Sequence, residues 1–292
     1  MESKIILITG ATAGIGKEAA AALAKQGHTV VIHGRNLNKA ELVRNELIAL
    51  TKNKNIDILT ADLFSLQDIT RAAREFKKRY DRLDVLINNA GAIFGKERET
   101  TKEGLEKTIT LNLLAPFLLM HSLVDVMAKS PSARIINLSS SMHRRGGKPD
   151  FSNFQSEKKY SPTRAYGLSK LYLIWISRHM SSQLKEKGIG NVTVNVTHPG
   201  AVATRFGQDA DKGFIINLIF KVALLFMAKP ADGARTSIYL ATSPKVENVT
   251  GEFFDNKEKI EKPDDKYYSK KNEKLVWDYC QQIVKPFLLK TY

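Results

Sequence analysis

The chain alternates between short apolar runs and longer amphipathic stretches. Seven runs rich in aliphatic and β-branched residues are typical of buried strands, and they cover residues 4–9, 28–33, 56–61, 84–88, 134–138, 192–197 and 252–255. Helical stretches lie between them, for example at 17–26, 38–50 and 65–80. Strands that alternate with helices predict right-handed crossovers. The pattern therefore predicts an α/β fold, with a doubly wound parallel sheet of about seven strands and helices on both faces.

The first predicted strand runs directly into a glycine-rich segment, TGATAGIG, at residues 9–16. The alanine-rich stretch after it is typical of a helix, and Gly27 ends that helix. Glycines let the backbone approach an anion, and the free N–H groups of a helix N-terminus bind phosphate. The segment therefore predicts a phosphate site, with a turn that serves only packing as the alternative. Its spacing is G-x-x-x-G-x-G, not the commoner G-x-G-x-x-G.

Tyr166 and Lys170 lie four residues apart in the segment YGLSK, within a helical context. That spacing places both side chains on one face of a helix. A phenol titrates near pH ~10 and exchanges protons poorly at neutral pH. A cation beside it stabilises the phenolate, so we expect Lys170 to lower the pKa of Tyr166 and to make its hydroxyl useful in proton transfer. The same spacing occurs by chance in surface helices, so the pair gains weight from the motifs around it.

With the segment NNAG at residues 88–91, these motifs make the chain resemble the short-chain dehydrogenase/reductase family. The resemblance covers residues 4–254, with each motif in the family's order. It implies a Rossmann-like single domain that transfers a hydride between a nicotinamide cofactor and a carbonyl or alcohol. Ligands of such sheets bind beyond the carboxyl ends of the strands, and all three motifs fall at those ends.

The resemblance also implies which residues contact the cofactor. They are Gly10, Thr12, Ala13, Gly14, Ile15 and Gly16 in the glycine-rich turn, Arg35 after the second strand, Asp62 and Leu63 after the third, Asn89, Ala90 and Gly91 after the fourth, Tyr166 and Lys170 in the helix, and Pro199, Gly200, Val202 and Thr204 after the sixth. Asp62 is expected to contact the adenine ring, with capping of the helix near Ser65 as the alternative. Thr204 is expected to bond the nicotinamide carboxamide.

The second strand indicates which nicotinamide cofactor is preferred. NAD-binding sites usually place a carboxylate at its end to bind the ribose diol, but here no Asp or Glu occurs between Glu18 and Glu41. Arg35 stands there instead, and a guanidinium suits a 2′-phosphate. We therefore expect NADP(H) in preference to NAD(H). Ala13 departs from the family pattern, because many NADP-preferring members have a basic residue at that position. Lys17 and Lys39 are alternative phosphate contacts, or ordinary solvated lysines.

By resemblance, Asn112 and Ser140 complete the catalytic set with Tyr166 and Lys170. Asn112 lies in an apolar helix, where the resemblance implies that it supports a water-mediated proton path to Lys170; a structural bond to the backbone is the alternative, and the two are compatible. Ser140 aligns with the second serine at the end of the fifth strand and would donate a hydrogen bond to the substrate oxygen. The other serines considered are the neighbouring Ser139 and Ser141, and Ser152, which fits the family's shorter serine–tyrosine spacing but lies in a loop-like stretch.

The substrate prediction rests on two segments. The polar insertion at 142–165 is longer than the commonest family spacing and is similar to the retinol-dehydrogenase-like and protochlorophyllide-reductase-like branches. We therefore expect a bulky lipophilic carbonyl or alcohol. The family's substrate lid corresponds to residues near 205–229, which include an apolar run at 214–227. That run favours a lipophilic substrate, a peripheral membrane contact or a homo-oligomer contact, with packing on its own core as the alternative.

Composition adds limits. A chain of 292 residues with 43% hydrophobic content fits one domain, 1–292, with a C-terminal helical extension near 269–292. The first strand begins almost at Met1, so we expect no cleavable signal and a cytoplasmic protein. Cys280 is the single cysteine, and no metal site is expected.

The net charge of +15 is scattered in mixed runs and indicates a solvated surface, not a nucleic-acid partner. A non-catalytic NADP(H)-binding regulator and a peripheral membrane enzyme of retinoids or lipids are the alternative functions.

Overall fold

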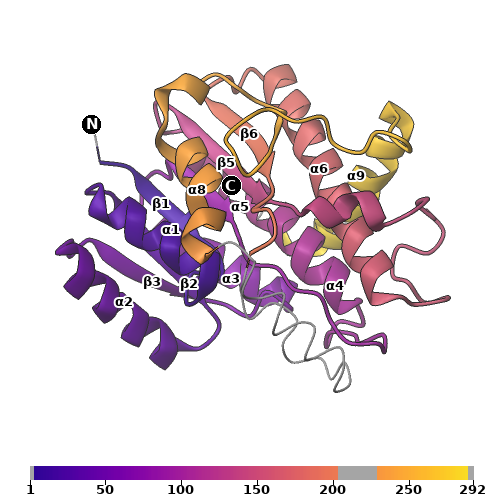
Figure 1. The fold of residues 1–292 in the computed structure, drawn as a ribbon, viewed down its shortest axis with the longest axis horizontal. Helices are drawn as coiled ribbons and strands as arrows, with labels where there is room; N and C mark the ends of the chain where they lie inside the picture. The colour runs from indigo at the N-terminus through magenta and orange to yellow at the C-terminus, as the bar shows by residue number, and fades with distance from the viewer. Residues whose placement is uncertain (1–2, 203–228, 289–292) are drawn as a thin grey trace.

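The structure is a computed structural model that describes residues 3–202 and 229–288. A seven-stranded parallel sheet forms its centre, in the order β3-β2-β1-β4-β5-β6-β7 (Figure 1). The strands are β1 (Ile5–Ile8), β2 (Thr29–Gly34), β3 (Ile56–Thr60), β4 (Val85–Asn88), β5 (Ala133–Leu138), β6 (Val192–Thr197) and β7 (Phe253–Phe254). All seven predicted strands are present, and the predicted doubly wound fold is confirmed.

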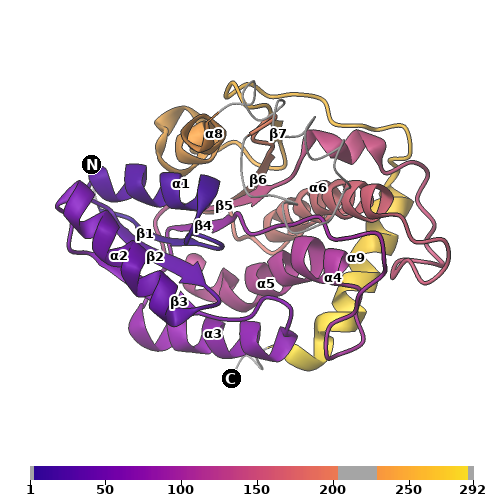
Figure 2. The same cartoon turned by 60° about the horizontal axis from the view of Figure 1, so that its bottom comes forward.

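Helices cover both faces of the sheet, as Figure 2 shows. Those described are α1 (Gly14–Lys25), α2 (Leu37–Thr51), α3 (Leu66–Arg79), α4 (Lys107–Ile109), α5 (Ala115–Met127), α6 (Pro162–Glu186), α8 (Pro230–Thr242) and α9 (Lys270–Val284), with a π-helical turn at Thr110–Leu114 and 3₁₀ turns at Ser141–Arg145, Pro244–Val246 and Lys285–Phe287. One apolar core lies between the sheet and α1, α2 and α8. The larger core lies on the opposite face, under α3, α5 and α6.

The order of the strands reverses between β1 and β4. From β1 the chain moves outward through β2 and β3, and it then crosses back to place β4 on the other side of β1, where Ile6 pairs with Val85. A parallel sheet opens a crevice at such a reversal, beyond the carboxyl ends of the strands. The glycine-rich turn after β1 and the NNAG segment after β4 therefore meet at this crevice.

The predicted C-terminal extension is a helix that packs on α6. The Ser269 hydroxyl accepts a hydrogen bond from Asn272 N at 3.1 Å and caps α9. The buried face of α9 includes Trp277, whose ring centroid lies 4.9 Å from that of Phe117. The insertion before α6 is anchored on α9, because the ring of Phe154 stacks on that of Tyr279 with centroids 4.0 Å apart.

The continuous helical stretch Lys107–Met127 is long and apolar enough to cross a membrane, but 78% of its most apolar window is buried inside the domain. Those side chains fill the core beneath the sheet, which accounts for their apolar character. The predicted lid near 205–229 lies almost entirely outside the described residues, as does Thr204.

Candidate active site

The glycine-rich turn has the geometry of an anion site. Gly10 and Gly14 have φ angles of +65° and +54°, which favour glycine. A Cβ atom at Gly16 would lie 2.5 Å from Asn89 Nδ2 and 2.6 Å from the Gly10 carbonyl oxygen, so the backbone is too close for any side chain. α1 begins at Gly14 with no side-chain cap and no acidic residue in its first turn. Its first N–H groups are therefore available to a phosphate, and the turn fits the pyrophosphate of a dinucleotide.

The NNAG segment is bonded to this turn. Asn89 Nδ2 donates to the Thr9 carbonyl at 2.8 Å, and Ala90 N donates to Thr9 Oγ1 at 3.0 Å. Gly91 then leads toward the catalytic residues. A Cβ atom there would lie 2.9 Å from both Asn112 Oδ1 and Lys170 Nζ. The backbone of this segment thus connects the predicted phosphate site to the predicted proton-transfer site.

The predicted catalytic side chains Ser140, Tyr166 and Lys170 come together between the end of β5 and the first turns of α6. The Ser140 side chain acts on the Tyr166 hydroxyl and lowers its pKa. Lys170 Nζ lies 5.8 Å from the centroid of the Tyr166 ring and donates to the Leu138 carbonyl at 2.8 Å. Helical spacing explains the pairing of Tyr166 with Lys170, and the end of β5 supplies the serine.

The structure separates Ser140 from the other serines. Ser139 Oγ is buried and donates to the Lys170 carbonyl at 2.9 Å, so it ties β5 to α6. Ser141 is exposed. Ser152 lies in the insertion, where its hydroxyl donates to Asp150 at 2.7 Å. Of the four candidates, Ser140 is the one whose side chain affects the pKa of Tyr166, and its catalytic role remains a prediction.

The expected direction of the Tyr166 pKa shift is wrong. Burial raises the pKa of Tyr166 to about 12, and the hydrogen bond from Ser140 opposes the rise without reversing it. Burial also lowers the pKa of Lys170 to about 7. Removal from water disfavours the charged form of each group, and burial is the largest cause of both shifts. At neutral pH, Tyr166 is therefore protonated, and its raised pKa makes it a weaker proton donor than a free phenol.

Asn112 lies in the π-helical turn and is bonded to the backbone on both sides of its amide. Its Oδ1 accepts from Ala92 N at 3.1 Å, and its Nδ2 donates to the Ala92 carbonyl at 2.9 Å. The backbone-bonded alternative is therefore present, and it fixes the loop that follows β4. Asn112 Oδ1 and Lys170 Nζ both lie beside Gly91, as a proton path between them would require.

The carboxyl ends of β2 and β3 hold the residues expected to contact the adenosine half of the cofactor. Arg35 is exposed and makes no hydrogen bond or ion pair with any residue that the structure describes. Lys17 is paired with Glu46 instead, and Lys39 is exposed on α2. Asp62 does not cap α3, since Ser65 does so through Asp68 N.

The end of β6 lies against the glycine-rich turn. Gly200 follows Pro199 with a φ angle of +74°. A Cβ atom at Gly233 of α8 would lie 2.8 Å from Val202 and 3.1 Å from Ile15. These contacts place Val202 beside the start of α1. The predicted cofactor residues at the ends of β1, β4 and β6 therefore face one crevice.

Comparison with known proteins identifies this arrangement. Residues 4–213 match the family model described as short chain dehydrogenase. The chain belongs to the short-chain dehydrogenase/reductase family. Its relatives include retinol dehydrogenase 13 of Mus musculus, which is 36% identical over 89% of this chain and 78% of its own length. Polyprenol dehydrogenase of Homo sapiens is 35% identical over 94% of this chain and 83% of its own. The chain lies in the retinol-dehydrogenase-like branch.

Solved structures show the same fold. An uncharacterized protein of Mycobacterium paratuberculosis superposes with a TM-score of 0.73 at 22% identity, over 97% of this chain and 93% of that one. A short chain dehydrogenase of Shigella flexneri, solved as a complex with NADP, gives 0.69 at 23% identity over 88% and 98%. As a member of the short-chain dehydrogenase/reductase family, the protein is an oxidoreductase that binds a nicotinamide cofactor and acts on CH–OH or C=O groups.

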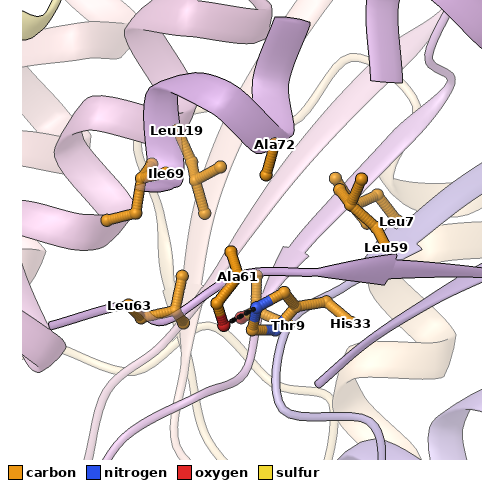
Figure 3. Close-up of a pocket in the computed structure, with 9 residues that line it drawn as sticks. All are labelled: Leu7, Thr9, His33, Leu59, Ala61, Leu63, Ile69, Ala72 and Leu119. Atoms are coloured by element: carbon orange, nitrogen blue, oxygen red, sulfur yellow. Dashed lines mark hydrogen bonds between the residues drawn. The ribbon is translucent and has the colours of Figure 1, made fainter. Parts of the chain in front are cut away.

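The structure of this dehydrogenase adds His33, which we had not assigned a role from the sequence. The Gly10 N–H donates to His33 Nδ1 at 3.2 Å, and His33 Nε2 lies 3.1 Å from the Ala61 carbonyl (Figure 3). Because Nδ1 accepts, the proton is on Nε2, and burial lowers the pKa of His33 to about 4. The neutral imidazole thus joins the glycine-rich turn to the segment that holds Asp62. The sequence signal that could have identified His33 is a polar residue in an otherwise apolar strand.

His33 also borders a cavity, drawn in Figure 3. Its volume is about 10 Å³, and its walls are mostly aliphatic. That volume is at the limit for one water molecule, so the cavity is a packing gap beneath β1, β2 and β3 and too small for a substrate.

Proposed function

We propose that this enzyme uses NADPH to reduce bulky lipophilic aldehydes or ketones, or NADP⁺ to oxidise the corresponding alcohols. The observation that carries the proposal is the grouping of Ser140 and Tyr166 with the buried Lys170, whose Nζ lies 5.8 Å from the centroid of the Tyr166 ring. These groups stand at the carboxyl end of β5, next to the crevice where the strand order reverses. A proton donor and a second hydrogen-bond donor are thereby placed around one position for a substrate oxygen.

The residues present fit a dinucleotide. The N–H groups at the start of α1 would bind its pyrophosphate, and residues 89–91 with 199–202 would border the nicotinamide. When bound, the nicotinamide supplies or accepts the hydride at the substrate carbon.

The protein's own groups manage the substrate oxygen. Ser140 donates a hydrogen bond to the carbonyl oxygen, on which negative charge develops during reduction. Tyr166 gives its proton to that oxygen and becomes a tyrosinate. The Lys170 ammonium stabilises the tyrosinate, and a proton from solvent then restores the phenol. Alcohol oxidation reverses these proton movements.

Arg35 supports the preference for NADP(H). It directly follows β2, it is exposed, and its guanidinium has no partner among the described residues. A guanidinium binds a phosphate through two parallel hydrogen bonds. The Shigella flexneri dehydrogenase with NADP bound shows that a protein of this fold accepts that cofactor.

The relatives support a lipophilic substrate. Retinol dehydrogenase 13 and polyprenol dehydrogenase are named for long apolar alcohols. The insertion before α6 carries Phe151 and Phe154, and Phe154 is held in place by Tyr279. An insertion with a fixed aromatic base beside the catalytic helix is consistent with recognition of a large apolar substrate.

The test is a turnover assay with purified protein. Loss of NADPH absorbance should be followed with retinal, long-chain aldehydes and polycyclic quinones, and each reaction should be repeated with NADH. We expect turnover on at least one bulky carbonyl, faster with NADPH. Tight NADPH binding without turnover on any of them would favour the non-catalytic regulator. Co-sedimentation with liposomes would separate a peripheral membrane enzyme from a freely soluble one.

A further inference from the structure

The segment that follows the edge strand β7 folds back over the end of the sheet. Asp255 Oδ1 accepts from the N–H groups of Lys257 at 2.7 Å and Lys259 at 2.9 Å, which closes a tight turn. The chain then returns antiparallel to β7, and Glu261 N donates to the Phe253 carbonyl at 2.8 Å. We call residues 255–264 the C-terminal strap. Its backbone is fixed by the strand that it covers.

The strap contacts the turn after β6 through His198. The Gly200 N–H donates to His198 Nδ1 at 3.2 Å, so the ring proton is on Nε2, which donates to Glu261 Oε2 at 3.1 Å. Asn256 of the strap also packs closely on Gly200, because a Cβ atom added at Gly200 would lie 2.7 Å from Asn256 Nδ2. The turn predicted to lie beside the nicotinamide is therefore held by the strap from two sides.

The strap contacts the loop after β5 through His143. His143 Nδ1 lies 2.7 Å from the Ser140 carbonyl, to which it donates, and its Nε2 accepts from Asp264 N at 3.1 Å. The proton is thus on the opposite nitrogen from that of His198. His143 is 1% exposed, and Ser140 is the residue whose side chain lowers the pKa of Tyr166.

The two histidines share one aromatic neighbour. The fully buried ring of Phe253 lies with its centroid 5.1 Å from that of His143 and 5.5 Å from that of His198. Arg144 closes the arrangement from outside, since its Nη2 donates to Glu261 Oε1 at 2.7 Å and to the Lys262 carbonyl at 3.0 Å. Rings and hydrogen bonds therefore join the loops after β5 and β6 through one segment.

We propose that the C-terminal strap positions Ser140 and the turn at residues 199–200 for the reaction, through His143 and His198. The proposal rests on the proposed function for the role of Ser140 toward the substrate oxygen. His143 and His198 are positioning residues, because each acts on the backbone of a neighbour and neither contacts the reacting groups. A shift of about 1 Å in such a group can lower a rate by about 10²-fold, so a fixed strap matters to turnover more than to cofactor affinity.

Two substitutions of His143 separate its two hydrogen bonds. In His143→Asn the side-chain amide nitrogen can take the place of Nδ1 and still donate to the Ser140 carbonyl. In His143→Gln the amide oxygen reaches the place of Nε2 and accepts from Asp264, while the bond to Ser140 is lost. We expect kcat to fall about tenfold or more in His143→Gln and to stay within about threefold of wild type in His143→Asn, with NADPH affinity nearly unchanged in both. Equal kcat values in the two variants would overturn the role of His143.

Glu261→Ala tests the strap without disturbing a buried ring, because the Glu261 side chain is 37% exposed. Its matched control is Glu186→Ala, which removes a carboxylate from the exposed end of α6. Amide hydrogen exchange should become severalfold faster in peptides covering 139–146 and 198–202 in Glu261→Ala, and should stay unchanged in Glu186→Ala. Faster exchange in neither loop, or in 198–202 alone, would contradict the linkage.

Hydrogen exchange does not depend on turnover. A wild-type protein that reduces no carbonyl but shows the linked exchange would refute the proposed function and leave the strap's coupling of the two loops established. An active enzyme in which Glu261→Ala changes hydrogen exchange in neither loop would support the proposed function and refute the strap's coupling of the two loops.

Discussion

The two ends of the candidate site differ in the groups that line them, which are backbone N–H groups at one end and side chains at the other. At the predicted phosphate end, residues 9–16 offer backbone N–H groups, and glycines permit the turn. At the predicted catalytic end, the candidate groups are side chains from the π-helical turn, the end of β5 and α6. The first end is nearly continuous in sequence, whereas the second gathers Asn112, Ser140 and Tyr166 with a strap that lies about a hundred residues further along.

The difference predicts how each end fails. A backbone site is damaged by adding atoms, and the damage should appear in cofactor affinity. A side-chain site is damaged by removing a functional group, and the damage should appear in kcat while the cofactor still binds. The four changes below test this division in order of expected effect.

Tyr166→Phe should have the largest effect. The buried ring keeps its packing, and only the hydroxyl is lost. Loss of the proton donor should lower kcat by about 10³-fold, while the dissociation constant for NADPH, measured by fluorescence titration, changes by less than about threefold. Turnover close to that of wild type would remove Tyr166 from the mechanism.

Gly16→Ala should give the opposite result. The added Cβ would meet Asn89 Nδ2 at 2.5 Å and the Gly10 carbonyl oxygen at 2.6 Å, so the turn must move. We expect NADPH binding to weaken by about 10²-fold, and the free energy of unfolding to fall by about 1–3 kcal/mol. Once saturated with cofactor, the variant should keep much of the wild-type kcat.

Gly190→Ala is the control for that change. No heavy atom lies within 4 Å of its would-be Cβ, and its φ angle is not in the left-handed region. Both NADPH affinity and thermal stability should stay close to wild type. A loss of affinity in Gly190→Ala equal to that in Gly16→Ala would show that the effect is unrelated to the turn.

The fold could be predicted from the sequence because its signals are local. Residues 5–8 are aliphatic and residues 192–197 are mostly β-branched, as is typical of parallel strands buried on both faces. The strand predicted at 252–255 is present in the structure as the short edge strand β7, Phe253–Phe254. The phosphate end was equally predictable, because the glycines that permit its turn all lie within residues 10–16.

The catalytic end could be predicted only in part. The spacing of Tyr166 and Lys170 indicated a pair, but the direction of the Tyr166 pKa shift depends on burial, which a sequence does not display. The contacts of His143 and His198 with the strap also depend on how β5, β6 and β7 are arranged. Long-range packing decides these features, and a single sequence carries no local signal for them.

Lys170 predicts a pH dependence. With a pKa near 7, lowered by burial, its amine is charged below that pH and becomes neutral above it. The charged form stabilises the tyrosinate left by proton donation, so kcat for reduction at saturating NADPH should fall about tenfold per pH unit above pH ~7. In Lys170→Arg the guanidinium stays charged, and the profile between pH ~6 and ~9 should be flat, at a lower kcat. A wild-type profile that is also flat would place the relevant charge elsewhere.

Arg35→Ala should have the smallest effect, confined to the phosphate end. If Arg35 binds the 2′-phosphate, its loss should raise the dissociation constant for NADPH about tenfold and leave that for NADH within about twofold. Arg74→Ala is the control, since Arg74 is an exposed arginine on α3 and its removal changes the net charge equally. A general electrostatic contribution from the net charge of +15 would weaken NADPH binding in both variants alike. Weakening in Arg35→Ala alone would assign the phosphate to that guanidinium, whereas equal losses for NADPH and NADH would show that Arg35 supports the end of β2 and does not distinguish the cofactors.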